Sequence, residues 1–119
     1  MRREYSKAEL ERGEALLLEF DRLADQKYQY RASRYGLTVG DTPLESVVGH
    51  LVEELVELLY AMFPDLSLDG AVNWFTERVQ MVLRQRMGTV MGKDIATELF
   101  DIRNLARLAY VCGKVQDRI

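Results

Sequence analysis

Two pairs of acidic residues are notable because the members of each pair lie three residues apart inside a leucine-rich segment. Glu54 and Glu57 occur in HLVEELVELLYAM, and Glu98 and Asp101 occur in KDIATELFDIRNLARLAY. In a helix, a spacing of three residues places both carboxylates on one face, about one turn apart. Carboxylates grouped in this way are suited to holding a hard divalent cation.

The apolar neighbours of the two pairs suggest that the acids border a packed interior. Two like charges about 4 Å apart repel by roughly 1 kcal/mol in water and by several times more in a partly buried site. Desolvation adds to this cost, and a divalent cation would remove both terms. Oxygen-only ligands favour magnesium, or manganese in its place, held between pairs that face each other across a helical bundle.

A solvated surface is the simpler explanation for either pair alone, because acidic residues on helices usually face water. The occurrence of both pairs in leucine-rich helices favours the metal site. A di-iron bundle is disfavoured because no Glu-x-x-His motif is present. A structural zinc is also disfavoured, since His50 and Cys112 are the only histidine and cysteine and could supply at most two ligands.

His50 lies four residues before Glu54, on the same side of the expected helix. It is therefore expected to orient that carboxylate or to contact a nucleotide. The alternative is an exposed histidine that bonds a neighbouring acid and has no catalytic role.

Local start and stop signals predict four helices, which would position these groups. Ser6 and Glu9 form a capping box for a first helix that runs to about residue 35, where Gly36 stops it. Thr42 and Glu45 form a second box around Pro43, so a second helix is expected from about residue 43 to Pro64.

The third helix is expected to begin after Ser67 or Asp69 and to end at Gly88. The fourth is expected to begin after Asp94 and to be closed by Gly113. Trp74 lies beside the apolar stripe of the third helix. It could stack on a nucleotide base, or it could belong to the core or to an oligomer interface. Four helices with short links predict an all-α four-helix bundle, with residues 1–119 as a single domain.

The composition argues against several classes of function and location. The formal charge of −3 comes from 16 basic and 19 acidic residues, so no cationic surface for a nucleic-acid polymer is expected. The N-terminal segment has no apolar run that would make a secretory signal or membrane anchor. The single cysteine fits a reducing compartment, and the sequence therefore predicts a cytoplasmic protein that does not bind a membrane.

The acidic motifs resemble those of a known family, the all-α, MazG-like nucleoside triphosphate pyrophosphohydrolases. The family carries EExxE on one helix and ExxD on a later one, which here read Glu53-Glu54-Leu-Val-Glu57 and Glu98-Leu-Phe-Asp101. The resemblance covers these two helices, about a quarter of the chain. The 40 residues between the motifs, 58–97, exceed the commonest spacing in the family.

The resemblance implies magnesium-dependent hydrolysis between the α- and β-phosphates of a nucleoside triphosphate, in a homodimer or homotetramer that completes the bundle. Such an enzyme would release pyrophosphate and a nucleoside monophosphate, for example to clear non-standard or surplus nucleotides. Glu53 would be an auxiliary ligand or the group that orients the attacking water, and Glu54 would act with it. The implied metal ligands are Glu54, Glu57, Glu98 and Asp101, and the candidate substrate contacts are His50, Lys93, Asn104 and Trp74.

Two other functions remain open at this stage. One is a metal-free helical module that dimerises through its leucine-rich faces. The other is a related hydrolase of phosphoribosyl-nucleotide metabolites, because the metal motif would handle the phosphate chain whatever the base.

Overall fold

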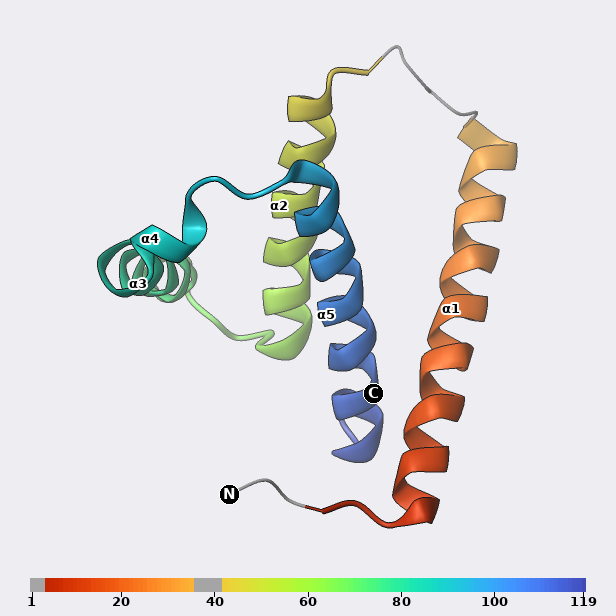
Figure 1. The fold of residues 1–119 in the computed structure, drawn as a ribbon. Helices are drawn as coiled ribbons and strands as arrows, with labels where there is room; N and C mark the ends of the chain where they lie inside the picture. Colours follow the sequence, from red (N-terminus) through yellow and green to blue (C-terminus); the bar gives the residue numbers. More distant parts are fainter. Residues whose placement is uncertain (1–3, 36–41) are drawn as a thin grey trace. The chain divides into compact units, whose positions relative to one another are not determined.

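The computed structural model describes residues 4–35 and 42–119, with side chains described for 4–30 and 42–119. Within these ranges all regular secondary structure is helical, which confirms the all-α class. The helices are α1 (Lys7–Tyr35), α2 (Leu44–Met62), α3 (Leu68–Gln85), α4 (Met87–Val90) and α5 (Ile95–Val115) (Figure 1). The four long helices correspond to those expected from the sequence, and the single-turn α4 is additional.

The chain divides into two compact units. The first combines Met1–Leu37 with Lys93–Ile119 and so contains α1 and α5, while the second is Thr38–Gly92 and contains α2, α3 and α4. The four-helix bundle and the single domain therefore stay predictions.

The first unit begins as its sequence predicts. The backbone N–H of Ser6 donates to Glu9 Oε1 at 3.2 Å, and the backbone N–H of Glu9 donates to Ser6 Oγ at 3.1 Å. This reciprocal pair is a capping box, so α1 starts with its first donors satisfied. The expected stop at Gly36 lies outside the described residues.

Helix α5 starts as predicted but ends later. Asp94 accepts hydrogen bonds from the backbone N–H and the hydroxyl of Thr97, both at 3.0 Å. Gly113 does not close the helix, which continues to Val115. Asp117 ends it instead, with a φ of 56° and a hydrogen bond from the next residue back to the Gly113 carbonyl at 2.8 Å, as in a Schellman motif.

The second unit shows two further differences from expectation. Thr42 does not cap α2, because Pro43 occupies the N-cap position and no side chain bonds there. At the other end, Pro64 follows α2 as predicted. Gly88 does not end α3, which stops at Gln85, and instead lies inside α4.

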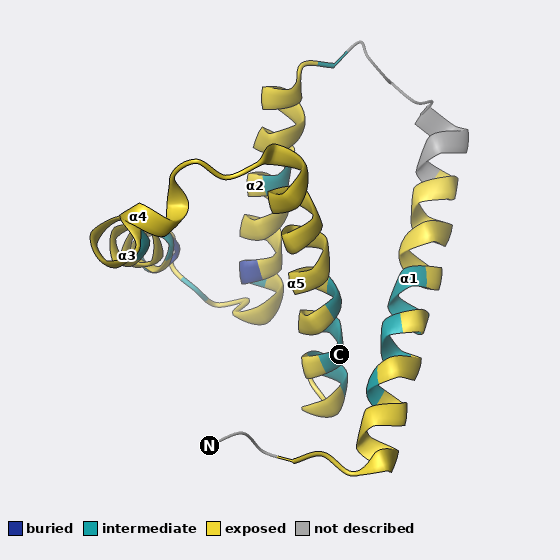
Figure 2. Cartoon of the chain, in the orientation of Figure 1, coloured by how far each residue is buried: buried dark blue, intermediate teal, exposed yellow. Residues whose placement is uncertain are grey.

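The turn between α2 and α3 is held by a side-chain cap and by a close approach of Leu66 to the helix start. Ser67 caps α3 by accepting from the Gly70 N–H at 3.0 Å. A Cβ on Gly70 would lie 2.8 Å from Leu66 Cδ1, so a larger residue here would require the Leu66 side chain to shift. The described residues that are classed as buried both belong to this unit, Leu59 at 3% exposed and Ala71 at 6% (Figure 2).

The first unit has half-buried residues where α1 and α5 meet, and no fully buried side chain among those described (Figure 2). Many large apolar side chains in both units are exposed to solvent. Among the described residues, no helix is both long and apolar enough to cross a membrane.

Candidate functional site

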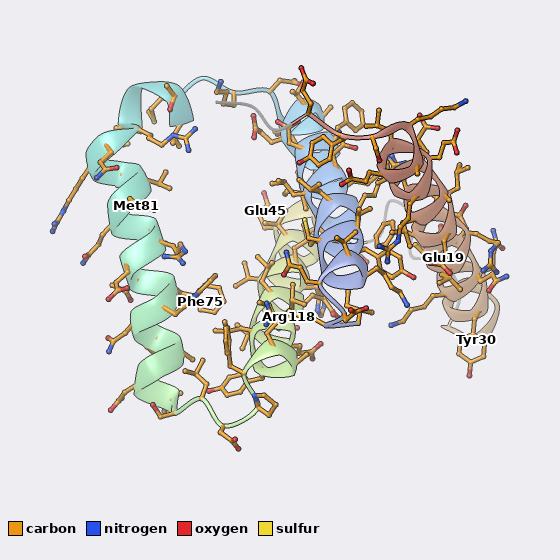
Figure 3. All side chains as sticks on the ribbon, turned by 90° about the horizontal axis from the view of Figure 1, so that it is seen from below. Glu19, Tyr30, Glu45, Phe75, Met81 and Arg118 are labelled. Carbon is orange, nitrogen blue, oxygen red and sulfur yellow. The ribbon has the colours of Figure 1, made fainter. Side chains whose placement is uncertain are left out.

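Helix α5 has a face that is occupied by α1. Arg107 lies there with Nε 2.9 Å from Asp21 Oδ1 and Nη2 donating to Asp21 Oδ2 at 3.0 Å. Arg103 Nη2 donates to the same carboxylate at 3.3 Å. The Tyr110 hydroxyl donates to Glu19 Oε2 at 2.9 Å, so polar contacts link the two helices at successive turns (Figure 3).

Ring contacts complete this contact region, which we call the α1–α5 seam: Glu19, Phe20, Asp21, Arg103, Arg107, Tyr110 and Lys114. The Phe20 and Tyr110 ring centroids are 5.4 Å apart, and Lys114 Nζ lies 5.6 Å from the Tyr110 ring. Arg107 Nε is buried and makes no hydrogen bond among the described residues, despite its short distance to Asp21. We therefore interpret the Nε contact as ionic and the Nη2 contact as the directional bond.

The predicted acidic pair of α5 lies on the other side of that helix. At 3.6 residues per turn, Glu98 and Asp101 are rotated by about 150° from the seam positions. Both side chains are exposed, and neither makes an ion pair or side-chain hydrogen bond with any described residue. No positively charged side chain among the described residues therefore pairs with either carboxylate.

Apolar residues extend this same outer face of α5 toward its C-terminal end. Leu105 and Leu108 are rotated from the seam by about 130–170°, and they are 64% and 55% exposed. A purely solvated acidic face would not be expected to continue into leucine at successive turns. The outer face, defined by Glu98, Asp101, Leu105 and Leu108, therefore has the composition of a contact surface.

The second unit repeats this arrangement on α2. Glu54 and Glu57 are exposed and have no side-chain partner within residues 4–35 and 42–119. Leu59, the buried residue of α2, is rotated from this pair by about 140–160°. Val47 and Leu58, which flank the pair on its own side, are exposed. The acids of α2 therefore lie opposite the one buried residue of that helix, whereas half-buried Leu51 and Tyr60 lie about 60° from Glu54 and Glu57, respectively.

His50 does not orient Glu54. Its Nδ1 lies 2.9 Å from Glu53 Oε2, and both side chains are exposed. The spacing of three residues brings His50 to Glu53 as readily as the spacing of four would bring it to Glu54. Glu53, the candidate for orienting water, is thus the acid of the first motif that has a protein partner.

The other residues predicted to contact substrate belong to different units of the chain. Lys93 precedes the Asp94 cap and Asn104 lies one turn after Asp101, so both accompany α5, and both are exposed. Trp74 belongs to α3, where its ring centroid is 5.1 Å from that of Phe75 and 4.6 Å from Arg78 Cζ. Because Arg78 covers the indole, Trp74 is not a bare stacking platform.

Two groups near these residues have shifted acidities. Hydrogen bonds from the backbone and side chain of Thr97 lower the pKa of Asp94. The hydrogen bond to Glu19 raises the pKa of Tyr110, with burial and the charge of Glu19 adding to the shift. Both shifts follow from the cap and the seam, and neither involves a predicted metal ligand.

Within each unit, the described side chains form no group of three or more His, Cys, Asp or Glu residues arranged to hold a metal ion. Each unit contributes two of the four predicted ligands. As a donor set, four unpaired carboxylates fit magnesium, which prefers oxygen and is held by one or two carboxylates together with waters and substrate phosphates.

The sequence reasoning did not identify the α1–α5 seam. Asp21 contacts arginines 82 and 86 residues further along the chain, and local spacing carries no signal at such separations. The weak signal available was the charge pattern of α5, in which Arg103, Arg107 and Lys114 recur at helical intervals on one face.

Comparisons of the chain with protein-family models, curated proteins and solved structures found no match.

Proposed function

We propose that this chain is a cytoplasmic, magnesium-dependent nucleoside triphosphate pyrophosphohydrolase, in which the acidic pairs of α2 and α5 together bind the metal. One observation carries the proposal. Each pair is exposed, unpaired among the described residues, and set among exposed apolar residues on the side of its helix that packing within the unit leaves free.

The physical reason is that such a surface is poorly suited to remain in water. Exposed leucines favour burial, at about 25 cal/mol per Å² of apolar surface, whereas unpaired carboxylates oppose it. Contact between the two acidic faces, within a chain or between two copies, becomes favourable when a cation compensates the four charges. Oligomerisation to a dimer or tetramer is part of the proposal for the same reason.

The acidic residues would have two separate tasks, metal binding and proton transfer. Glu54, Glu57, Glu98 and Asp101 would hold the ion, and a bound magnesium supplies charge neutralisation of the phosphate oxygens and a more acidic coordinated water. Glu53 accepts the proton of the attacking water, and the His50 ring, with its proton on Nδ1, fixes the carboxylate by donating to it.

The water oxygen forms a bond to the α-phosphorus, and the bond from that phosphorus to the bridging oxygen breaks. The products are a nucleoside monophosphate and pyrophosphate. Lys93 and Asn104, which accompany α5, would contact phosphate oxygens.

The test is pyrophosphate release from a panel of nucleoside triphosphates with magnesium. We expect Glu54→Gln and Asp101→Asn each to lower the rate by about a hundredfold or more. Glu45→Gln is the matched control. Glu45 is exposed on α2 (Figure 3), and helical spacing places it about 180° from Glu54. Absence of release from every substrate, or equal losses in all three variants, would contradict the proposal.

The exposed apolar residues favour one other candidate, a metal-free helical module that dimerises through them. The two candidates differ in their response to magnesium. A bound ion raises the melting temperature by mass action, whereas the interaction module predicts no change. Neutralising the acids would also stabilise the module by relieving repulsion.

A further inference from the structure

The charges of α5 are sorted onto opposite faces. Its three basic residues, Arg103, Arg107 and Lys114, lie on the side that faces α1. The outer face carries Glu98 and Asp101 and has no basic residue. A flexible basic side chain near the outer face would lower the negative potential that attracts a cation.

Helical spacing places the arginines on this side of α5, and Asp21 holds their guanidinium groups there. Its carboxylate binds both guanidinium groups, Arg107 at 2.9 and 3.0 Å and Arg103 at 3.3 Å. The side chains of Asp21 and Arg107 are 27% and 23% exposed, so their pair is partly shielded from solvent. Without this carboxylate, the two arginines would lose the only acidic partner that the described residues give them.

We propose that Asp21 is a positioning residue for the metal site: it holds the two guanidinium groups of α5 against α1 and away from the acidic outer face. The role rests on the proposed function, since it presumes that Glu98 and Asp101 bind a cation. Asp21 itself touches neither metal nor substrate. Its effect is electrostatic.

The experiment measures Mn²⁺ binding to the full chain by the electron paramagnetic resonance of free Mn²⁺, without turnover. We expect Asp21→Ala to weaken binding by about threefold to tenfold at low salt, and by less at about 0.5 M salt, where screening shortens the reach of the freed charges. Asp21→Glu, which keeps the carboxylate, should bind as wild type does.

Two further variants separate this role from stability. Tyr110→Phe removes another seam hydrogen bond but no charge, so it should lower the melting temperature and leave Mn²⁺ affinity unchanged. Replacing Asp21, Arg103 and Arg107 together by Leu removes the freed cations and should restore the affinity lost in Asp21→Ala. Such replacements of a shielded ion pair are often tolerated. Asp21→Ala with Arg103→Leu is the milder form, because Arg103 is the more exposed arginine.

The outcomes are distinct. Loss in Asp21→Ala with recovery on removal of the arginines supports the role. Wild-type affinity in Asp21→Ala, equal losses in Tyr110→Phe, or no recovery on removal of the arginines overturns it while leaving the proposed function standing. Absence of Mn²⁺ binding by the wild-type chain overturns both.

Discussion

The two faces of α5 use charge in opposite ways. Toward α1, the charged groups Asp21, Arg103, Arg107 and Glu19 all have partners at 2.9–3.3 Å. On the outer face, Glu98 and Asp101 have none among the described side chains. The acids of a single chain thus serve as structural contacts in one place and are left available in another.

The two faces of α5 also differ in how far their residues are buried. The seam has half-buried residues around its ion pairs, whereas the outer face has exposed leucines beside exposed acids. Burial with a partner is how proteins usually accommodate a carboxylate. The proposed contact between the acidic faces would remove this apolar surface from water and would place a cation beside the unpaired charges.

The largest expected effect tests whether the outer face is a contact surface. If Leu105 is removed from water in the assembled protein, Leu105→Asn should lower the free energy of unfolding by about 2 kcal/mol. Leu18→Asn on α1 is the matched control, because Leu18 is 69% exposed and lies outside both acidic faces.

The control should change stability by less than about 0.5 kcal/mol. Urea unfolding of both variants gives the comparison. Equal, small changes would mean that Leu105 is an ordinary exposed leucine and that the two faces of α5 differ only in charge.

A smaller loss of stability is expected when the arginines of the α1–α5 seam are removed one at a time. Arg107→Ala leaves the shielded Asp21 carboxylate with a weaker partner and should cost about 1–2 kcal/mol. Arg103→Ala should cost less than about 1 kcal/mol, because the Arg103 side chain is 61% exposed and screened by water. Equal costs in thermal unfolding would show that the two contacts are not distinguished by burial.

The smallest effect concerns the start of α5, where Asp94 caps the helix that carries both faces. Its pKa is lowered in the folded chain, so its contribution is fully present above the ordinary value of 3.8 and is lost as the pH falls through the folded pKa. Asp94→Asn keeps a capping side chain without that titration.

Helix content followed by circular dichroism during acid titration should therefore fall more steeply below pH 3.8 in the wild-type chain than in Asp94→Asn. Identical titrations would show that the cap does not depend on the charge of Asp94.

The parts of the fold that the sequence predicts correctly depend on neighbouring residues. The Ser6–Glu9 box, the Asp94 cap and the stop before Pro64 each involve groups a few positions apart. The Thr42 box was wrong because Pro43 itself occupies the cap position. The Gly113 stop was wrong because Asp117 provides the positive φ two residues after Val115, which lets α5 continue.

The candidate site also has some features that follow from local spacing and others that depend on distant contacts. Helical spacing alone places each acidic pair on one face of its helix. The apolar neighbours predicted that these faces border a packed interior, but all four acids are exposed in their units. The His50 partner required a choice between spacings of three and four, which the sequence could not make. The contacts of Asp21 with Arg103 and Arg107 join residues more than 80 positions apart, so local spacing could not predict them.

The most direct test of the central claim is a double-mutant cycle on Mn²⁺ binding with Glu54→Gln and Asp101→Asn. If the two acidic pairs share one ion, each single variant should weaken binding by about tenfold or more, and the double variant should lose less than the product of the two factors. The claim would be contradicted if each single variant lost one class of sites and kept the other at wild-type affinity, or if the wild-type chain bound no Mn²⁺.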